Sequence, residues 1–187
     1  MPEQATMVAP PRAGVFFDPE REKILGFLQI LQTKTEDLND LSRWSRGGAM
    51  GRPGRSRYAD FMRCRDVAAE CWAFSIVIER RIDLYHGPER DTLQAQFDRL
   101  TVAIWSVLLE TSLRFLEALA GEDHLPLGSR EIFVREIKTL YDSRKFLEDP
   151  RYDDLIDVAT HRRQDQATRI LEAIIERAPA LLDFSAA

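Results

Sequence analysis

The sequence is poor in the residue types that most catalytic and metal sites use. Its 187 residues include two cysteines and three histidines, and neither a Glu-x-x-His nor a Gly-x-Ser-x-Gly motif occurs. The first motif supplies iron ligands in helical bundles, and the second carries the nucleophile of many hydrolases. We therefore predict no catalytic residues, no metal ligands and no cofactor, and a protein that is not an enzyme.

Two of the histidines have structural interpretations. His86 follows Asp83 by three residues, a spacing seen in helical metal sites, but it also directly precedes Gly87. A cation just before such a glycine complements the dipole at a helix C-terminus, and we favour this interpretation. Asp157 and His161 are four residues apart, so a surface hydrogen bond or ion pair is expected.

We also expect no disulfide, no leader peptide and no membrane span. Cys64 and Cys71 are separated by two turns of one helical pattern, a rise of about 10.5 Å, which is too far for a disulfide. The first 17 residues have no basic region followed by an apolar one. The most apolar stretch, residues 101–121, contains three charged side chains that a bilayer centre disfavours. These absences predict a reduced, cytoplasmic protein without membrane contact.

Helical periodicity fills most of the chain. Asp18 and Pro19 suit the N-cap and the first position of a helix within residues 17–45. From Tyr58, small and apolar side chains recur every three or four residues, as in the seam of a packed helix. These side chains are Phe61, Cys64, Ala68, Cys71, Ser75, Ile78, Ile82 and Tyr85. Gly87 and the proline after it predict the end of that helix and the start of the next.

The next helix carries two apolar stripes. The first stripe comprises Leu93, Phe97, Leu100, Ile104 and Val107. The second stripe comprises Val102, Trp105, Leu109 and Leu116. A helix that is apolar on two sides has to be covered on both, so we predict that it lies at the centre of its bundle.

The remaining pattern completes an all-α fold. A fourth helix is expected around the apolar residues between positions 132 and 141, and a fifth from Tyr152 to about Ala178, with a polar middle that predicts exposure or a bend. No strand pattern competes, so we predict a single bundle of about five helices. Its parts are a mobile N-terminal tail (1–16), the N-terminal helix (17–45), an Arg/Gly-rich loop (46–57) and a helical bundle (58–183).

The end of the fifth helix is apolar on two sides. The residues concerned are Ile170, Leu171, Ile174, Ile175, Leu181 and Leu182. One neighbouring helix covers only one of these two sides. The apolar side that stays uncovered predicts a homodimer through this helix.

Positive charge is concentrated in residues 43–65 of a chain whose formal net charge is -5. This stretch holds seven arginines, four of the nine glycines and a single acid, Asp60. Arginines neutralise phosphates or acidic side chains, and aromatic rings beside them offer stacking surfaces. The candidate partner- or anion-binding residues are Arg43, Trp44, Arg46, Arg52, Arg55, Arg57 and Tyr58. A plain solvated loop and a loop docked on the protein's own acidic surface are the alternatives, and the acidic remainder disfavours nucleic acid.

One region resembles a known family. Tyr58 and the sequence RCRDVAAE precede Trp105, and Leu125, Pro126 and Arg130 follow it after a helix and a turn. Residues 58–148 thereby resemble the flagellar biosynthesis regulator FlaF family, although a threonine stands where that family has asparagine shortly before the tryptophan. The resemblance implies a non-catalytic bacterial helical protein that controls flagellin production or export through protein contacts.

These observations predict a function in binding. We expect a cytoplasmic, non-enzymatic adaptor or regulator whose partner is another protein, and the resemblance implies flagellin or a flagellar regulator as that partner. Two alternatives stay open at this point. One is a nucleic-acid-binding regulator that uses the arginine-rich loop, and the other is a helical-bundle enzyme or cofactor carrier.

Overall fold

The computed structural model describes residues 18–43, 55–120 and 129–181 of the chain. Its elements are α1 (Pro19–Leu41), α3 (Arg55–Leu84), α4 (Arg90–Ala120), α5 (Ser129–Leu147), the short 3-10 helix η1 (Pro150–Leu155) and α6 (Val158–Leu181). These residues form no strand, which confirms the predicted all-α bundle. Within the same ranges, every helix falls short of the combination of length and apolarity needed to cross a membrane. The predicted tail (1–16) and most of the Arg/Gly-rich loop lie outside the described residues.

Helix α1 begins as predicted. The carboxylate of Asp18 accepts hydrogen bonds from the backbone N–H groups of Glu20 at 3.0 Å and Arg21 at 3.2 Å, and Pro19 occupies the first helical position. A carboxylate that accepts two of the free N–H groups of a first turn is an N-cap. The helix ends at Leu41, before the predicted boundary, where the Ser42 hydroxyl donates to the carbonyl of Asn39 at 2.7 Å.

The predicted seam of α3 is confirmed. All eight of its small and apolar side chains, from Phe61 to Tyr85, are buried. Helix α3 begins at Arg55, so it includes the last three residues of the predicted Arg/Gly-rich loop (46–57). Arg55, Ser56 and Arg57 are all compatible with a helix, so the first turn forms before Tyr58. The helix ends at Leu84, which leaves His86 exposed in the turn instead of in a last helical turn.

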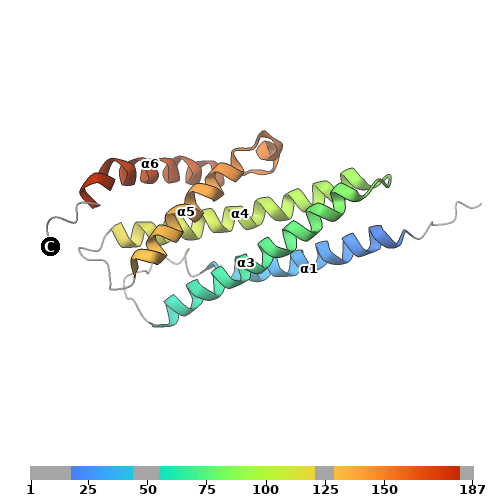
Figure 1. Cartoon of the computed structure of the whole chain (residues 1–187), viewed down its shortest axis with the longest axis horizontal. Coiled ribbons are helices and arrows are strands. Elements are labelled where there is room, and N and C mark those ends of the chain that lie inside the picture. The colour runs from blue at the N-terminus through green and yellow to red at the C-terminus, as the bar shows by residue number, and fades with distance from the viewer. Residues whose placement is uncertain (1–17, 44–54, 121–128, 182–187) are drawn as a thin grey trace, which may run out of the picture.

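Two hydrophobic cores share α4, and this confirms its predicted central place. The first core joins α4 to α1 and α3, and it buries Leu93, Phe97, Ile104 and Val107 of the first stripe. The second core joins α4 to α5, η1 and α6, and it buries Val102, Leu109 and Leu116 of the second stripe. Trp105 packs against both cores. Figure 1 shows α4 running between the α1–α3 pair and the α5–α6 pair.

The chain after α5 differs from its prediction. Tyr152 does not start the last helix: it is buried in η1, which Asp149 caps by accepting from the N–H of Arg151 at 2.9 Å. Helix α6 begins at Val158 and continues past the predicted end to Leu181. Its polar middle is not exposed on every side. One face is buried and comprises Thr160, Gln164, Ala167 and Leu171.

Candidate functional site

The described part of the structure does not bring together the residues that were predicted to bind a partner or an anion. Arg43 forms an exposed ion pair with Asp40 at 2.8 Å. Arg55, Arg57 and Tyr58 lie in the first turn of α3, and their side chains are not described. The other three, Trp44, Arg46 and Arg52, lie outside the described residues. The arginine-rich site therefore stays a prediction.

Trp105, from the family-like motif, is the second of four aromatic rings that contact one another in a row. Its ring meets Trp72 of α3 edge-on at 5.2 Å and stacks on Phe146 of α5 at 4.9 Å. Phe146 in turn stacks on Tyr152 of η1 at 4.9 Å. The row joins α3, α4, α5 and η1, so the tryptophan has a packing role. Arg130 lies at the start of α5, and Leu125 and Pro126 lie outside the described residues.

A buried ion pair ties α3, α4 and α5 together. Arg65 of α3 donates to both carboxylate oxygens of Glu136 of α5, with a distance of 3.1 Å from Nε to Oε1. The same guanidinium donates to Thr111 at 2.9 Å and to Ser112 at 2.8 Å, both on α4. Ser112 also donates to Glu136 at 2.8 Å. The carboxylate is fully buried, its charge is matched by Arg65, and the network links the three helices through side-chain hydrogen bonds.

Sequence reasoning missed this network. Arg65 and Glu136 are 71 positions apart, and each lies in a different helical pattern. One signal was available: Glu136 stands three residues after Phe133 and four before Leu140, at a position where the period of α5 calls for a buried side chain. A carboxylate at such a position requires a cation from elsewhere in the fold.

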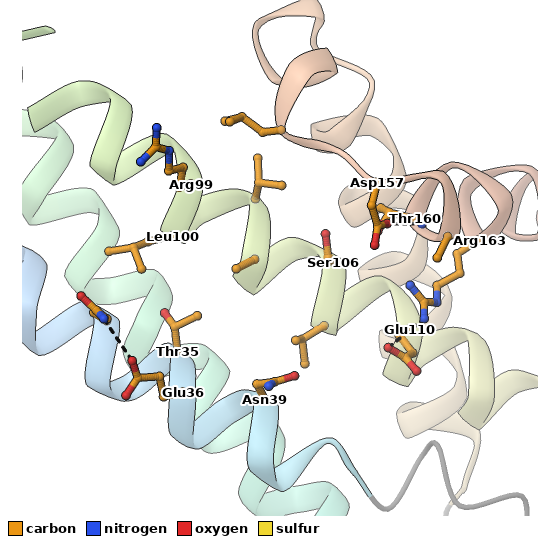
Figure 2. Close-up of a pocket in the computed structure, with 16 residues that line it drawn as sticks. Thr35, Glu36, Asn39, Arg99, Leu100, Ser106, Glu110, Asp157, Thr160 and Arg163 are labelled. Atoms are coloured by element: carbon orange, nitrogen blue, oxygen red, sulfur yellow. Dashed lines mark hydrogen bonds and ion pairs between the residues drawn. The ribbon is translucent and has the colours of Figure 1, made fainter. Parts of the chain in front are cut away.

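A groove runs over α4 between α1 and α6. Its volume is about 760 Å³, and its long floor comes from α4. In Figure 2 the side chains of α1 line one side of it and those of α6 the other. Along the floor, Arg99, Ala103, Ser106 and Glu110 follow one another at intervals of four, three and four residues, so they form one stripe of the helix. Small side chains thus occupy the middle of the floor and charged ones its two ends.

The charges around the groove are mostly satisfied by its own walls. Glu110 is buried and pairs with Arg163 of α6 at 3.3 Å. Asp157 accepts from the backbone N–H of Thr160 at 2.7 Å, and the hydrogen bonds from Thr160 hold the pKa of Asp157 below its ordinary value. Arg99 is exposed and forms no ion pair with any described residue. A single cation at one end of the floor is therefore available to a partner.

The predicted pairing of Asp157 with His161 takes another form. Asp157 serves the start of α6, since its backbone carbonyl also accepts from the N–H of His161 at 3.1 Å. The ring of His161 lies 3.1 Å from the side-chain oxygen of Gln164 instead. The two residues are thus joined through the backbone, and the imidazole bonds along its own helix.

The cysteines and acidic residues show no metal-binding arrangement in the ranges described. Within these ranges, no group of three or more His, Cys, Asp or Glu side chains is placed so that it could hold a metal ion. Both cysteines are free and buried in α3. Burial raises the pKa of the Cys71 thiol to about 11, so the thiolate that would act as a nucleophile or metal ligand is disfavoured.

Comparison of the chain with family models, with curated proteins and with solved structures found no match. The fold and the groove themselves define the class, which is an all-α bundle with an open groove over its central helix. The resemblance to the FlaF family is neither strengthened nor weakened by these comparisons.

Proposed function

We propose that the protein is a non-enzymatic adaptor or regulator that binds an amphipathic helix of another protein in the groove over α4. The observation that carries this proposal is the groove itself, with a floor from α4 and walls from α1 and α6. Two helices that flank a third leave between them the space that a further helix fills in a bundle. Recognition of a helix in such a groove is a common mode of protein binding.

The floor suits a helix in length and in side-chain size. From Arg99 to Glu110 the stripe rises roughly 16 Å, which is three helical turns. Ala103 and Ser106 in its middle are small, so the backbone of a partner helix can approach α4 closely. Leu100, Val102 and Val107 line the groove beside the stripe. Val102 and Val107 are buried in the two cores, so the half-buried Leu100 offers the main apolar contact.

The charges of the floor orient the partner. Arg99 has no described ion pair, so the partner helix is expected to carry an acidic residue at that end. Glu110 is already matched by Arg163 at the other end, where a neutral partner residue is expected. The partner is thus an amphipathic helix with small or apolar residues at its centre and an acid near one end.

Capture of partners by the tagged full chain from a native extract tests the proposal. Ala103→Trp fills the floor and Arg99→Glu reverses its free charge, and both are expected to abolish capture of a protein that the native chain retains. Ala95→Trp adds the same bulk at an exposed position of α4 and is the matched control, with capture retained. A synthetic peptide covering an acidic amphipathic helix of that protein should bind the native chain and not the Ala103→Trp variant. Capture that survives both groove changes would refute the groove as the binding site.

The narrower role in flagellin synthesis or export rests on the resemblance alone. It predicts flagellin or a flagellar regulator among the captured proteins. The alternative of a nucleic-acid-binding regulator rests on the arginines between positions 43 and 57, and it predicts a salt-dependent gel shift. A bundle enzyme or cofactor carrier would show an absorbance or a bound metal in the purified protein.

A further inference from the structure

The outward face of α3 is apolar and exposed. Four of the ten large apolar side chains exposed in the described part of the chain belong to this helix. Their exposed fractions are 47% for Trp72, 53% for Ile76, 46% for Val77 and 61% for Leu84. Val77 and Leu84 lie on the side of α3 opposite the seam that packs on α1 and α4, and they belong to a second stripe. Trp72 and Ile76 lie between the seam and this stripe, and Trp72 packs edge-on against Trp105 of the core.

The residues along this face have a symmetric order around Ala73. In sequence they are Met62, Asp66, Ala69, Ala73, Val77, Arg80 and Leu84, at intervals of four, three, four, four, three and four. Residues at equal distances along the chain before and after Ala73 therefore form pairs. These pairs are Ala69 with Val77 (four residues away), Asp66 with Arg80 (seven) and Met62 with Leu84 (eleven). Each pair is complementary: small with medium, acid with base, and apolar with apolar.

We propose that the α3 helices of two copies of this chain pair antiparallel through this face, around a twofold axis at Ala73. In an antiparallel pair with that axis, each residue meets the one at the equal step on the other side of Ala73 in the second copy. Ala73 then meets its own counterpart, and the small side chain there permits close approach of the two backbones. Met62 to Leu84 span about 33 Å. Met62 is half-buried and its sulfur lies 3.9 Å from the guanidinium of Arg135 of α5, so the fully exposed part of the stripe runs from Asp66 to Leu84.

The charges on this face support a second copy as the occupant. Asp66 and Arg80 are exposed, and neither forms an ion pair with any described residue. Their immediate neighbours on α3 are paired within the chain: Arg65 with Glu136, and Arg81 with Glu20 at 2.6 Å. The symmetric pairing would match Asp66 of each copy with Arg80 of the other, which forms two ion pairs at once.

This face is distinct from the homodimer surface that the sequence predicted on the last helix. On α6, Leu171 is buried and Ile170 packs against the second core. Ile175 is 70% exposed, and Leu181 carries no described side chain. Substitutions at Ile175 therefore separate the two surfaces.

Sedimentation equilibrium of the full chain tests the proposal by charge reversal. In the dimer, Asp66→Arg brings two pairs of positive charges together, and Arg80→Asp brings two pairs of negative charges together. Each variant is therefore expected to raise the dissociation constant of the dimer about tenfold or more. The double variant Asp66→Arg/Arg80→Asp exchanges the charges and should restore the native dissociation constant. Both positions are exposed, so circular dichroism should show the native helix content in all three variants.

Ala73→Arg places a charge on the axis and should give a monomer. Ile175→Arg on α6 is the matched control, and it should leave the dimer intact. A native chain that sediments at 21.5 kDa up to high micromolar concentration would overturn the proposal. Dissociation by Ile175→Arg, or single and double charge variants with equal dissociation constants, would overturn it as well.

Discussion

The hydroxyl of Tyr85, in the turn between α3 and α4, donates a 2.8 Å hydrogen bond to the carboxylate of Asp18, at the start of α1. The other oxygen of the same carboxylate caps α1 by accepting from Glu20 and Arg21. One side chain therefore both begins a helix and ties it to a distant turn. The hydrogen bonds from the Arg21 backbone and from Tyr85 hold the pKa of Asp18 below its usual range.

The lowered pKa of Asp18 predicts a loss of stability in acid. A carboxyl whose pKa is lower in the folded than in the unfolded chain stabilises the fold fully above the unfolded pKa, about 3.9 for Asp, and loses this contribution as the pH falls through the folded pKa. Asp18→Asn keeps a capping oxygen but cannot ionise. We expect it to melt a few degrees lower at pH 7 and to lose less melting temperature than the native chain between pH 5 and pH 2.5, followed by circular dichroism.

The matched control for that experiment is Tyr85→Phe, which removes the tether and keeps the cap. It should lower the melting temperature at pH 7 while retaining part of the acid dependence, because the hydrogen bonds from the Arg21 and Glu20 backbone remain. Equal acid dependence in the native chain and in Asp18→Asn would contradict the assigned role of the carboxylate.

Gly87 is required by the position of the Tyr85 ring. A Cβ at residue 87 would lie 2.0 Å from the hydroxyl oxygen of Tyr85 and 2.2 Å from its Cζ. Gly87→Ala is therefore expected to displace the ring and to destabilise the fold by about 1–3 kcal/mol in urea unfolding. Gly26→Ala, in α1, is the matched control. A Cβ there meets no atom within 4 Å, so that change should stabilise the fold by about 0.5–1 kcal/mol.

The clash at Gly87 can be tested for its cause. Removing the ring with Tyr85→Ala should make the added methyl group at 87 nearly neutral, although the variant itself is less stable. A double variant Tyr85→Ala/Gly87→Ala that is destabilised by the full sum of the two single changes would show that the ring is not what requires the glycine.

Cys71 is expected to be unreactive in the folded chain. Its pKa is raised to about 11 by burial, and the pKa of Cys64 is raised for the same main reason. At pH 8 both thiols are then protonated and enclosed, whereas alkylation requires an accessible thiolate. Iodoacetamide at pH 8 should label neither cysteine within minutes in the native chain and both in urea, as followed by mass spectrometry. Rapid labelling of the native chain at either position would contradict the burial of α3.

The parts of the fold that the sequence predicted are those set by spacing within one helix. The predicted seam of α3 and the two predicted stripes of α4 are confirmed, because burial of apolar side chains at intervals of three and four dominates their energetics. The break after α5 was recognised, but its 3-10 turn was not, since Tyr152 fits a helical period as well as a turn. The groove could not be foreseen, because it depends on where α1 and α6 lie across α4.

The ion pair of Arg65 and Glu136 belongs to the part that spacing does not reveal, and its energetics can be measured. Glu136→Gln leaves the guanidinium of Arg65 without its counterion, and Arg65→Met leaves the buried carboxylate with only the more distant Arg135, at 3.7 Å. Each is expected to destabilise the fold by about 3–5 kcal/mol in urea unfolding. The exposed pair of Lys138 and Asp142, also on α5, is the control, because Asp142→Asn should cost about 0.5 kcal/mol or less.

The double variant Arg65→Met/Glu136→Leu decides whether the pair acts as a unit. With both charges replaced by apolar side chains, no uncompensated charge remains buried, so this variant should be more stable than the Arg65→Met single variant. Thr111 and Ser112 keep other acceptors, since Thr111 also donates to the carbonyl of Val107 at 2.9 Å and serine can bond along its own helix. A double variant destabilised by the sum of the two single changes would mean that Arg65 and Glu136 contribute separately. In that case the register of α3, α4 and α5 would be set by the apolar cores and not by this network.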